Sequence, residues 1–479
     1  MSLTLTDIYL GTGGQHIHPA LAAFPISDFV IDSRRATPGS CFIALPGAHS
    51  DGHEHIADAI ANGAIAIIAH RIPQNAAVQV IRPESEPAPQ RVTPPVLFLT
   101  SDSLTALQNL AAYWRGRHTP TVVAITGSVG KTSTKELTAA VLRQRFPTLW
   151  TPGNYNNEIG LPLSLLQLRP EHRYAVLEMG FYVEGEIAQL CEIAHPHIGV
   201  ITNIGPIHLE RAGSMEAIFR GKAELIQALP SSGRAILNWD DPWVRKMAAF
   251  SPAPVFKYGL SEEADLWADQ IESYGLAGIR FRFHHRQASG GIETFYVNLP
   301  LLGRHSVHTA LRAAAVGLLA DMQWADIIRG LRDVDARLRI DIAPGYNGST
   351  LIDDTYNASP PSTIAALNLL QEMDGRRIAI LGDMLELGGE EEIGHRLVGA
   401  RAAETSDMLI TVGPRSRWIA EEARALGMDA ARIHATESAE EAAAIAREAI
   451  QPGDFILIKG SRAMRMDEIV ASLTAPIDK

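Results

Sequence analysis

One segment constrains the fold of this chain more than any other, a glycine-rich turn enclosed between a strand pattern and a helix pattern. The β-branched run 121–125 (TVVAI) is typical of a parallel strand that is covered on both faces. The turn TGSVGKTS follows, and then Leu137, Ala140 and Val141 recur at helical spacing. A buried strand that runs through a tight turn into a helix begins a βαβ unit, so the sequence predicts an α/β protein with a mostly parallel sheet.

The turn itself is predicted to bind phosphate. Its glycines let backbone N–H groups approach phosphate oxygens, and the start of the following helix adds a favourable dipole. Lys131 is placed to reach the β- and γ-phosphates, and the Thr132 hydroxyl to bind Mg²⁺. Ile125 stands where the strict motif has a further glycine, so only the shorter T-G-x-x-G-K-T is present, and a plain glycine turn with a stray lysine is the alternative. The predicted nucleotide contacts here are Thr126, Gly127, Ser128, Val129, Gly130, Lys131, Thr132 and Ser133.

Polar side chains follow the next two strand patterns. Run 174–177 leads directly into Glu178. Ligands gather at the carboxyl ends of parallel strands, so Glu178 is a candidate Mg²⁺ ligand or water holder, with a simple strand-end turn as the alternative. Run 198–202 is followed by Asn203, His208 and Glu210. Considered alone, His208 is more typical of a hydrogen-bonded loop histidine, because Mg²⁺ prefers oxygen, and Lys222 on its predicted helix is more typical of a solvated lysine.

The chain has 479 residues, a length typical of about three domains. The pattern of short strands, helices and Pro/Gly punctuation predicts a small α/β domain over 1–101, with an exposed Pro-rich loop at 83–95. The central domain, built on the phosphate turn, is expected over 102–335. A second series of alternating strands and helices predicts a doubly wound, Rossmann-like domain over 336–479.

Composition excludes several classes of partner. With 42 Lys and Arg against 54 Asp and Glu, the net charge is −12, which disfavours nucleic acid and anionic membrane surfaces. No apolar run approaches the roughly 20 residues that cross a bilayer, so no membrane insertion is expected. Two cysteines, Cys41 and Cys191, exclude a disulfide scaffold and favour a reducing, cytoplasmic location, and the first residues lack the pattern of a secretory signal.

Taken together, these motifs resemble the Mur ligase family, the ATP-dependent amide ligases of peptidoglycan assembly, over nearly the whole chain. TGSVGKT resembles the shortened phosphate loop of that family, and LEMG (177–180) and ITNIGPIHLE (201–210) resemble the segments whose Glu and His bind Mg²⁺. The resemblance implies ATP and Mg²⁺, with Thr132 and Glu178 at one ion and His208 at the other. Lys222 matches a lysine that is carbamylated in several members, which would give it an oxygen ligand for Mg²⁺. The implied catalytic residues are Lys131, Glu178, His208 and Lys222.

The resemblance also suggests how the rest of the nucleotide is held. Segment 301–318 (LLGRHSVHTALRAAAVGL) resembles the family segment with the adenine-binding Asn, written G-R-H-N-V-x-N-A. Ser306 and His308 stand at the two Asn positions, and His308 retains the ability to hydrogen-bond or stack on the base. Arg337 matches an arginine of the third domain that reaches the nucleotide, and Asp354 an acidic residue near the ribose.

Two segments resemble those that hold the uridine-nucleotide substrate, namely 32–56 (DSRRATPGSCFIALPGAHSDGHEHI) and 153–166 (GNYNNEIGLPLSLL). The substrate contacts implied there are Ser33, Arg34, His49, Ser50, Asp51, Asn154, Asn156 and Asn157. A metal cluster of His49, His53 and His55 is the rival interpretation of the first segment. Solvated loop histidines are the preferred interpretation, because no cysteine or carboxylate triad accompanies them.

Three C-terminal motifs, LIDDTYNAS (351–359), LGDMLELG (381–388) and LIKGSRAMRM (457–466), resemble the branch that joins D-Ala-D-Ala to UDP-N-acetylmuramoyl-tripeptide through an acyl phosphate. The resemblance also implies that this chain is a monomer. The substrate contacts implied here are Asp353, Asn357, Lys459, Ser461 and Arg462, with a solvated pair at a helix start as the alternative for the last motif. The branch that adds a diamino acid to the dipeptide typically has D-Y-A-H-T-P and D-N-P-R motifs, and it remains the alternative. A non-catalytic nucleotide-binding regulator, supported only by Ser306 and His308, is the further alternative.

Overall fold

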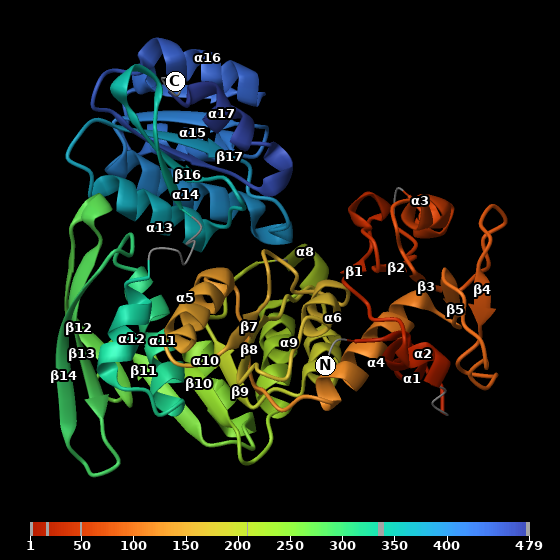
Figure 1. Ribbon diagram of the computed structural model, residues 1–479. Coiled ribbons are helices and arrows are strands. Elements are labelled where there is room, and N and C mark those ends of the chain that lie inside the picture. Colours follow the sequence, from red (N-terminus) through yellow and green to blue (C-terminus); the bar gives the residue numbers. More distant parts are fainter. Residues whose placement is uncertain (1–2, 16–18, 48–49, 208, 334–339, 476–479) are drawn as a thin grey trace.

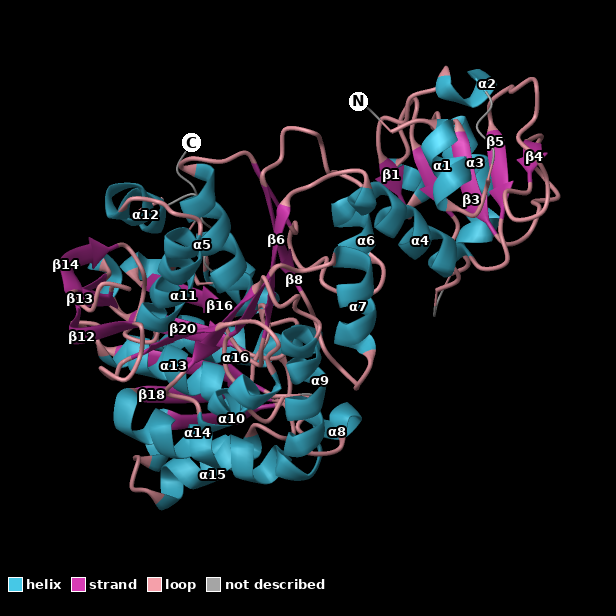
Figure 2. Ribbon diagram, turned by 90° about the horizontal axis from the view of Figure 1, so that it is seen from below, coloured by secondary structure: helices cyan, strands magenta, loops and turns pink. Residues whose placement is uncertain are grey.

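Three β-sheets follow one another along the chain. The structure is a computed structural model, and it describes residues 3–15, 19–47, 50–207, 209–333 and 340–475. Within these residues the sheets have five, nine and six strands. Figure 1 shows each sheet with its own helices, and Figure 2 shows the N-terminal unit standing apart from the other two. The predicted α/β class is confirmed, while the predicted domain limits stay predictions.

The N-terminal sheet is wholly parallel, in the order β1-β2-β3-β5-β4. Its central strands are short and completely buried, which matches the apolar runs that predict them. The strands are β1 (Phe29–Val30), β2 (Cys41–Ile43), β3 (Ala66–Ala69), β4 (Gln79–Ile81) and β5 (Val96–Leu99), and the helices are α1 (Leu5–Gly11), α2 (Pro19–Ala22) and α3 (Ile56–Ala61). The Pro-rich segment 83–95 contains no helix or strand, as predicted.

Helix α4 (Ser103–Gly116) joins the N-terminal unit to the middle one. It packs on α1 and on two helices of the middle unit, α6 (Gly160–Leu165) and α7 (Glu186–Ala194). Trp114 donates from Nε1 to the carbonyl of Leu168 at 3.1 Å, and buried Arg115 donates from Nε to the carbonyl of Ala194 at 3.0 Å. These bonds fix the end of α4 to the middle unit.

The middle sheet has the order β14-β13-β12-β11-β10-β9-β6-β8-β7. It is parallel from β7 to β12 and antiparallel from β12 to β14, so the prediction of a mostly parallel sheet is confirmed. Its strands are β6 (Thr121–Thr126), β7 (Thr148–Trp150), β8 (Tyr174–Glu178), β9 (Ile198–Ile201), β10 (Arg234–Asn238), β11 (Val255–Gly259), β12 (Leu266–Ser273), β13 (Ile279–Arg286) and β14 (Ile292–Leu299). The remaining helices of this unit are α5 (Lys131–Arg143), α8 (Leu209–Ala212), α9 (Met215–Gln227), α10 (Pro242–Lys246), α11 (Ser306–Leu319) and α12 (Trp324–Leu331).

The C-terminal sheet is doubly wound, in the order β15-β16-β20-β17-β18-β19, and only its edge strand β15 runs antiparallel. Separate apolar clusters cover its two faces. The strands are β15 (Asp341–Pro344), β16 (Thr350–Asp354), β17 (Arg377–Gly382), β18 (Met408–Val412), β19 (Ile433–Thr436) and β20 (Phe455–Lys459). The helices are α13 (Pro360–Gln371), α14 (Glu391–Thr405), α15 (Arg417–Ala425), α16 (Ala439–Ala449) and α17 (Asp467–Leu473).

The carboxyl ends of the central strands define where a ligand can bind. Ile125 lies opposite Glu178 across β6 and β8, and Thr126 lies opposite Ile201 across β6 and β9. The glycine turn, Glu178 and the segment after β9 therefore meet at one edge of the middle sheet, as the sequence predicts. In the part of the chain that the structure describes, no helix has the length and apolar character needed to span a bilayer.

Candidate active site

The glycine-rich turn is held open by its neighbours. Gly127 and Gly130 have φ angles of +143° and +83°, a region that favours glycine, and Gly130 caps the start of α5. Ser128 N donates to the carbonyl of Asn203 at 2.9 Å, and Val129 N donates to Asn203 Oδ1 at 2.9 Å. Lys131 Nζ donates to the carbonyls of Gly127 and Ser128 at 2.9 and 3.2 Å. The loop is thus preformed, and the ammonium group of Lys131 is held across it.

Glu178, at the end of β8, keeps one carboxylate oxygen without a partner. The residue is 1% exposed, and its Oε1 accepts a hydrogen bond from Asn156 Nδ2 at 2.7 Å. Its Oε2 is buried and has no hydrogen-bond partner among the described residues. A buried, unpartnered carboxylate oxygen is costly in an isolated protein, which indicates a place for a cation.

Lys222 on α9 is fully buried, so its interpretation as a solvated surface lysine is wrong. Its Nζ lies 4.4 Å from the centroid of the Phe181 ring and has no hydrogen-bond partner in the described ranges. Burial, and secondly the charge of Lys131, hold the pKa of Lys222 well below its ordinary value. An uncharged amine is the form that reacts with CO₂, so the setting of Lys222 suits the predicted carbamate.

These residues fit a magnesium site. Mg²⁺ is held by one or two protein carboxylates together with waters and phosphate oxygens. Among the described residues, no group of three or more His, Cys, Asp or Glu side chains lies together in a way that could hold a metal ion. Thr132 lies in the first turn of α5, and Glu178 supplies the orphaned oxygen. The predicted residues His49, His208 and Arg337 lie outside the described residues.

A cavity of about 320 Å³ extends from the phosphate loop to the C-terminal unit. Its lining comprises Val129, Gly130, Ser133, Asn203, Asn238, Leu301, Leu302, His305, Ser306, His308, Thr309, Arg312, Ile340, Asp354, Pro361, Ser362, Ala365, Ala366 and Lys459. The loop, α11 and the C-terminal sheet therefore share one cavity. The predicted nucleotide residues Ser133, His308 and Asp354 are brought together in it.

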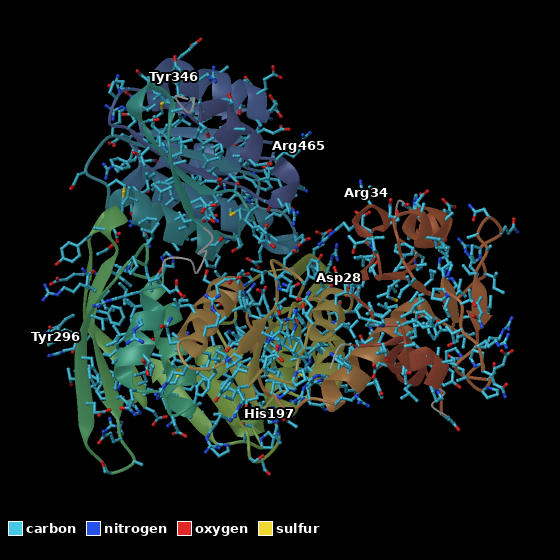
Figure 3. All side chains as sticks on the ribbon, viewed as in Figure 1. Asp28, Arg34, His197, Tyr296, Tyr346 and Arg465 are labelled. Carbon is cyan, nitrogen blue, oxygen red and sulfur yellow. The ribbon has the colours of Figure 1, made fainter. Side chains whose placement is uncertain are left out.

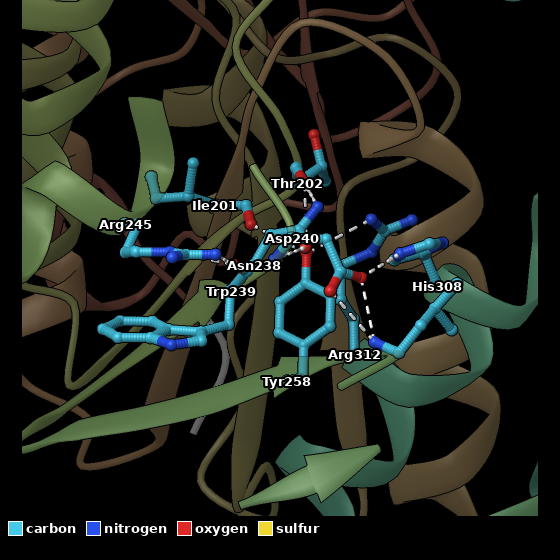
Figure 4. Close-up of polar contacts among 10 residues, drawn as sticks. Ile201, Thr202, Asn238, Trp239, Asp240, Arg245, Tyr258, His308 and Arg312 are labelled. Carbon is cyan, nitrogen blue, oxygen red and sulfur yellow. Dashed lines mark hydrogen bonds and ion pairs between the residues drawn. The ribbon is translucent and has the colours of Figure 1, made fainter. Parts of the chain in front are cut away.

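Behind this cavity, a polar network supports His308 (Figure 4). His308 Nε2 lies 2.8 Å from Asp240 Oδ2, and both Asp240 oxygens accept from Leu260 N. Burial opposes the charge of Asp240, but the hydrogen bonds from His308 and Leu260 outweigh it and lower the pKa of this carboxyl group. Ser306, the other predicted Asn replacement, instead donates to the carbonyl of Leu302 at 2.6 Å.

A second part of the network closes the end of β9. Burial raises the pKa of Tyr258 to about 12, so its hydroxyl stays protonated and donates to the carbonyls of Ile201 and Thr202 at 3.0 and 3.1 Å. Arg312, on α11, donates to Tyr258 Oη at 3.3 Å and to Thr309 Oγ1 at 2.8 Å. Thus α11 is tied to the end of β9, which pairs with β6, the strand that leads into the phosphate loop.

Lys459 lies inside the nucleotide cavity. Its Nζ donates to Asp354 Oδ2 at 2.6 Å and to the carbonyl of Asn357 at 2.8 Å, and the residue is 2% exposed. Ser461 is also buried, and its Oγ accepts from Leu385 N at 2.9 Å. The interpretation of this motif as a solvated pair is therefore wrong for Lys459 and Ser461. Arg462 is exposed beside the ring of Tyr356.

In the N-terminal unit, two neighbouring arginines lie close to the predicted substrate segments. Figure 3 shows Arg34 projecting on the side nearest the C-terminal unit. Arg34 bonds Asp32 through Nε and Nη2, and chiefly this pairing lowers the pKa of Asp32 to about 2. Arg35 Nη1 donates to Tyr155 Oη at 3.3 Å, which links this unit to the segment that contains Asn154, Asn156 and Asn157.

The remaining predicted substrate residues, in this unit and in the segment before α6, make local contacts. Asp51 caps a short 3₁₀ turn by accepting from His53 N at 2.9 Å, and it pairs with Arg71. Ser50 Oγ lies 2.9 Å from His55 Nε2, and Asn157 Oδ1 accepts from Gly160 N at the start of α6. His53 is buried against His70 and Asp51, so it is not the solvated loop histidine that was expected. Ser33 is buried, while Asn154 is exposed.

Sequence reasoning missed Asp240, Tyr258 and Arg312, and it gave Asn203 only a place at the sheet edge. Asp240 lies two residues after the end of β10, and polar residues in the turn after a buried strand were the signal that could have found it. Tyr258 and Arg312 carried no such signal, because their roles depend on side chains from α11, β9 and β11 meeting in space.

A parallel sheet with a preformed phosphate loop, an orphaned strand-end carboxylate and a cavity shared with a second α/β unit defines a nucleotide-dependent phosphoryl-transfer enzyme. Three family models match the chain: "Mur ligase family, catalytic domain" over 25–115, "Mur ligase middle domain" over 125–317, and "Mur ligase, glutamate ligase domain" over 338–462. The chain belongs to the Mur ligase family.

Similar proteins include two curated enzymes named UDP-N-acetylmuramoyl-tripeptide–D-alanyl-D-alanine ligase. The one from Mycobacterium tuberculosis is 36% identical over 475 residues, 93% of this chain and 91% of that protein. The one from Escherichia coli K12 is 36% identical over 458 residues, 92% of each chain. Among solved structures, MurF from Acinetobacter baumannii matches with a TM-score of 0.84, 31% identity and 98% of both chains. MurF from Thermotoga maritima in complex with ADP matches with a TM-score of 0.76, 29% identity, 93% of this chain and 96% of that chain.

Proposed function

We propose that this chain is an ATP- and Mg²⁺-dependent ligase that joins D-Ala-D-Ala to UDP-N-acetylmuramoyl-tripeptide through an acyl phosphate. The observation that carries the proposal is the meeting of the phosphate loop, the orphaned Glu178 oxygen and buried Lys222 at one sheet edge. The names of the similar proteins support this choice of substrates. The proposal places the reaction in the cytoplasm. A reducing compartment agrees with Cys41 and Cys191, which are both free, buried thiols. The proposed working unit is a single chain.

The first step is phosphoryl transfer from ATP to the free carboxylate of the tripeptide. Attack by an anion on an anion requires neutralisation of charge and in-line positioning. Lys131 supplies a positive charge at the loop, and the loop N–H groups bind phosphate oxygens. Thr132, Glu178 and carbamylated Lys222 would hold Mg²⁺, which supplies further neutralisation of the phosphate charge when bound. Asn156 orients the Glu178 carboxylate through their 2.7 Å hydrogen bond.

The second step joins the dipeptide. The uncharged amine of D-Ala-D-Ala attacks the acyl carbon, and the nitrogen gives up one proton to solvent as the C–N bond forms. The C–O bond to the phosphoryl group breaks, and inorganic phosphate leaves with the bonding electrons. Arg462, exposed beside Tyr356, is the proposed cation for the dipeptide carboxylate, because buried Lys459 is engaged by Asp354. Closure of the C-terminal unit over the middle unit would exclude the water that hydrolyses an acyl phosphate.

Release of inorganic phosphate from ATP by the purified chain tests the proposal. We expect Mg²⁺-dependent release with UDP-N-acetylmuramoyl-tripeptide plus D-Ala-D-Ala. The same assay with UDP-N-acetylmuramoyl-dipeptide plus lysine or diaminopimelate is expected to give none. Release only with the second pair would instead identify the diamino-acid-adding reaction, and release with neither pair would favour a regulator.

Lys131→Ala is the matched loss-of-function variant. Because Lys131 supplies the charge at the loop, we expect phosphate release to fall by 10²-fold or more, the range seen when one transition-state charge donor is removed. Lys246→Ala is the control, because this lysine stacks on Trp243 on α10, away from the loop. Full activity in Lys131→Ala would contradict the assigned role.

A further inference from the structure

This inference rests on the proposed Mg²⁺ site at Glu178 and concerns what holds that carboxylate in place. Glu178 Oε1 accepts from Asn156 Nδ2 at 2.7 Å, so the direction of the carboxylate depends on the position of Asn156. Asn156 belongs to segment 151–159, which joins β7 to α6 and contains no helix or strand. This segment therefore needs anchors from other elements to keep Asn156 beside Glu178.

One anchor comes from α5, the helix that begins at the phosphate loop. Lys135 Nζ donates to the carbonyl of Gly153 at 2.9 Å, three residues before Asn156. Lys131 and Lys135 lie four residues apart, so they share one face of α5. Lys131 lines a cavity together with Asn156, whereas Lys135 is 0% exposed and cannot touch a ligand. Lys135 can therefore act on the reaction only through the residues that it holds.

The backbone of Gly153 suits this contact. Its φ angle is +50°, in the left-handed region that favours glycine. A Cβ atom on Gly153 would meet no atom within 4 Å, so the backbone conformation favours glycine here, and lack of space does not. Beyond it, Asn156 N donates to the carbonyl of Asn154, and Gly180 N donates to the carbonyl of Asn156, both at 2.7 Å. A shift of Gly153 would therefore displace Asn156 and the turn after β8.

A lysine at this buried position requires a reason beyond filling space. An apolar side chain would fill it without the cost of removing an ammonium group from water. Lys135 also pairs with Glu136 at 2.9 Å, but these two residues are neighbours on one helix, so their pair fixes no other segment. Among the polar contacts of the Lys135 side chain with described residues, only the bond to Gly153 reaches another part of the fold.

We propose that Lys135 is a positioning residue for the metal site. It holds the carbonyl of Gly153, which fixes Asn156, and Asn156 in turn keeps the buried Oε2 of Glu178 directed to a cation. Partners of this kind set the orientation of a metal ligand without touching the metal. Helix α5 thus presents Lys131 to the phosphates from its first turn and holds the metal carboxylate from its second turn. One rigid element therefore sets the positions of both groups.

The test measures how tightly the full chain binds a divalent ion, with and without turnover. In the phosphate-release assay, we expect Lys135→Met to raise the Mg²⁺ concentration for half-maximal rate by about tenfold, the low end of the effect of such partners. The kcat at saturating Mg²⁺ should change far less, whereas partial unfolding would lower kcat at an unchanged Mg²⁺ requirement. Without turnover, electron paramagnetic resonance of free Mn²⁺, with the chain saturated with ADP, gives the dissociation constant of Mn²⁺ and should show the same ratio. Weakened Mn²⁺ binding in a chain that releases no phosphate would overturn the proposed function and support this inference.

Variants at Gly153 test the same path while the lysine stays in place, so the test does not depend on the folding of Lys135→Met. Gly153→Asn keeps access to the left-handed conformation and should bind Mn²⁺ as the wild type does. Gly153→Val disfavours that conformation and should weaken binding about as much as Lys135→Met. The double variant should bind no more weakly than the weaker single variant, because both changes act through one hydrogen bond.

Leu142→Ala is the matched control for loss of stability. Leu142 lies two turns farther along α5 and is 0% exposed, so its truncation leaves a cavity but keeps the bond between Lys135 and Gly153. The dissociation constant of Mn²⁺ should therefore stay at the wild-type value. An unchanged constant in both Lys135→Met and Gly153→Val, additive losses in the double variant, or an equal loss in Leu142→Ala would overturn the inference.

Discussion

Two buried lysines near the phosphate loop show how the groups around a side chain determine what it can do. Lys135 and Lys222 are both 0% exposed. Lys135 Nζ donates to the carbonyl of Gly153 at 2.9 Å and pairs with Glu136 at 2.9 Å, so its charge is compensated. Lys222 Nζ lies over the Phe181 ring and has no hydrogen-bond partner among the described residues, and burial holds the pKa of Lys222 well below its ordinary value. Burial thus makes one lysine a structural link to the predicted substrate segment and the other an uncharged nucleophile.

Replacement of Lys222 by Met is expected to stabilise the protein and abolish its activity. Below pH 10.5, the ordinary pKa, the unfolded chain protonates this amine, but the folded chain resists protonation, so folding releases a proton and costs free energy. Lys222→Met removes that cost, so the free energy of unfolding should rise by about 1–4 kcal/mol if the thioether packs well. The gain shrinks as the pH rises toward 10.5. Thermal unfolding in CO₂-depleted, Mg²⁺-free buffer measures it.

Lys135→Met is the matched control and should change stability in the opposite direction. It leaves the carbonyl of Gly153 and the carboxylate of Glu136 without their cation, which should destabilise the fold by about 1–3 kcal/mol. If both variants shifted the melting temperature in the same direction, the different settings of the two lysines would not explain their stability effects.

Carbamylation of Lys222 makes a separate prediction. Wild-type protein equilibrated with ¹³C-labelled bicarbonate at mildly alkaline pH should give one slowly exchanging carbamate carbon signal in the NMR spectrum. The signal should be absent in Lys222→Met and unchanged in Lys246→Ala. A signal that persists in Lys222→Met would assign the carbamate to another amine.

At the scale of elements, the phosphate loop depends on a close approach between β6 and the segment after β9. A Cβ atom on Gly127 would lie 1.9 Å from Thr202 Oγ1, and the φ angle of +143° disfavours any side chain. We therefore expect Gly127→Ala to cost about 1–3 kcal/mol in unfolding free energy and to weaken ATP binding. Denaturant unfolding and nucleotide titration measure the two effects.

Two further variants test the cause of that loss. Thr202 Oγ1 is buried without a partner in the described residues, so Thr202→Ala removes the obstacle at little cost, and the double variant should recover part of the stability. Gly116→Ala, at an exposed site in α4 with no atom within 4 Å, should be neutral or stabilising. A double variant no better than Gly127→Ala alone would rule out the steric cause.

The elements also show what sequence patterns can predict and what they cannot. The strands β6, β8 and β17 are buried on both faces, so their continuous apolar runs were recognisable, and the motifs at their carboxyl ends came with them. Strands β12 to β14 expose one face, as Tyr296 shows in Figure 3, and their mixed composition did not separate them from loops. The partners of Lys222 and Lys459 lie far away in the sequence, so spacing alone could not distinguish these buried residues from solvated ones.

At the scale of the whole molecule, two contacts join the C-terminal unit to the middle unit on opposite sides of α13. On one side the tip of the β12–β13 hairpin meets α13, where Ser273 Oγ donates to Glu372 Oε2 (Figure 1). On the other side Gly388 approaches α8 so closely that a Cβ atom there would lie 3.2 Å from Glu210 N. A movement of the C-terminal unit away from the middle unit would have to break both contacts.

The hairpin contact is expected to weaken as the pH rises. Burial raises the pKa of Glu372 above its ordinary value of 4.5, and the hydrogen bond from Ser273 only partly offsets this. A raised carboxyl pKa means that the folded state holds the Glu372 proton more tightly than the unfolded chain does. The contribution of this residue to stability is therefore fully present below pH 4.5 and is lost as the pH rises through the folded pKa.

Glu372→Gln keeps an oxygen to accept from Ser273 but carries no charge. It should therefore raise the melting temperature at pH 7, by less than about 1 kcal/mol in free energy because the residue is only half-buried, and leave it unchanged near pH 4.5. Glu272→Gln, at an exposed neighbour that bonds Tyr274 Oη, is the control and should show no such pH dependence. Equal shifts at both pH values would show that burial of the Glu372 charge does not limit this contact.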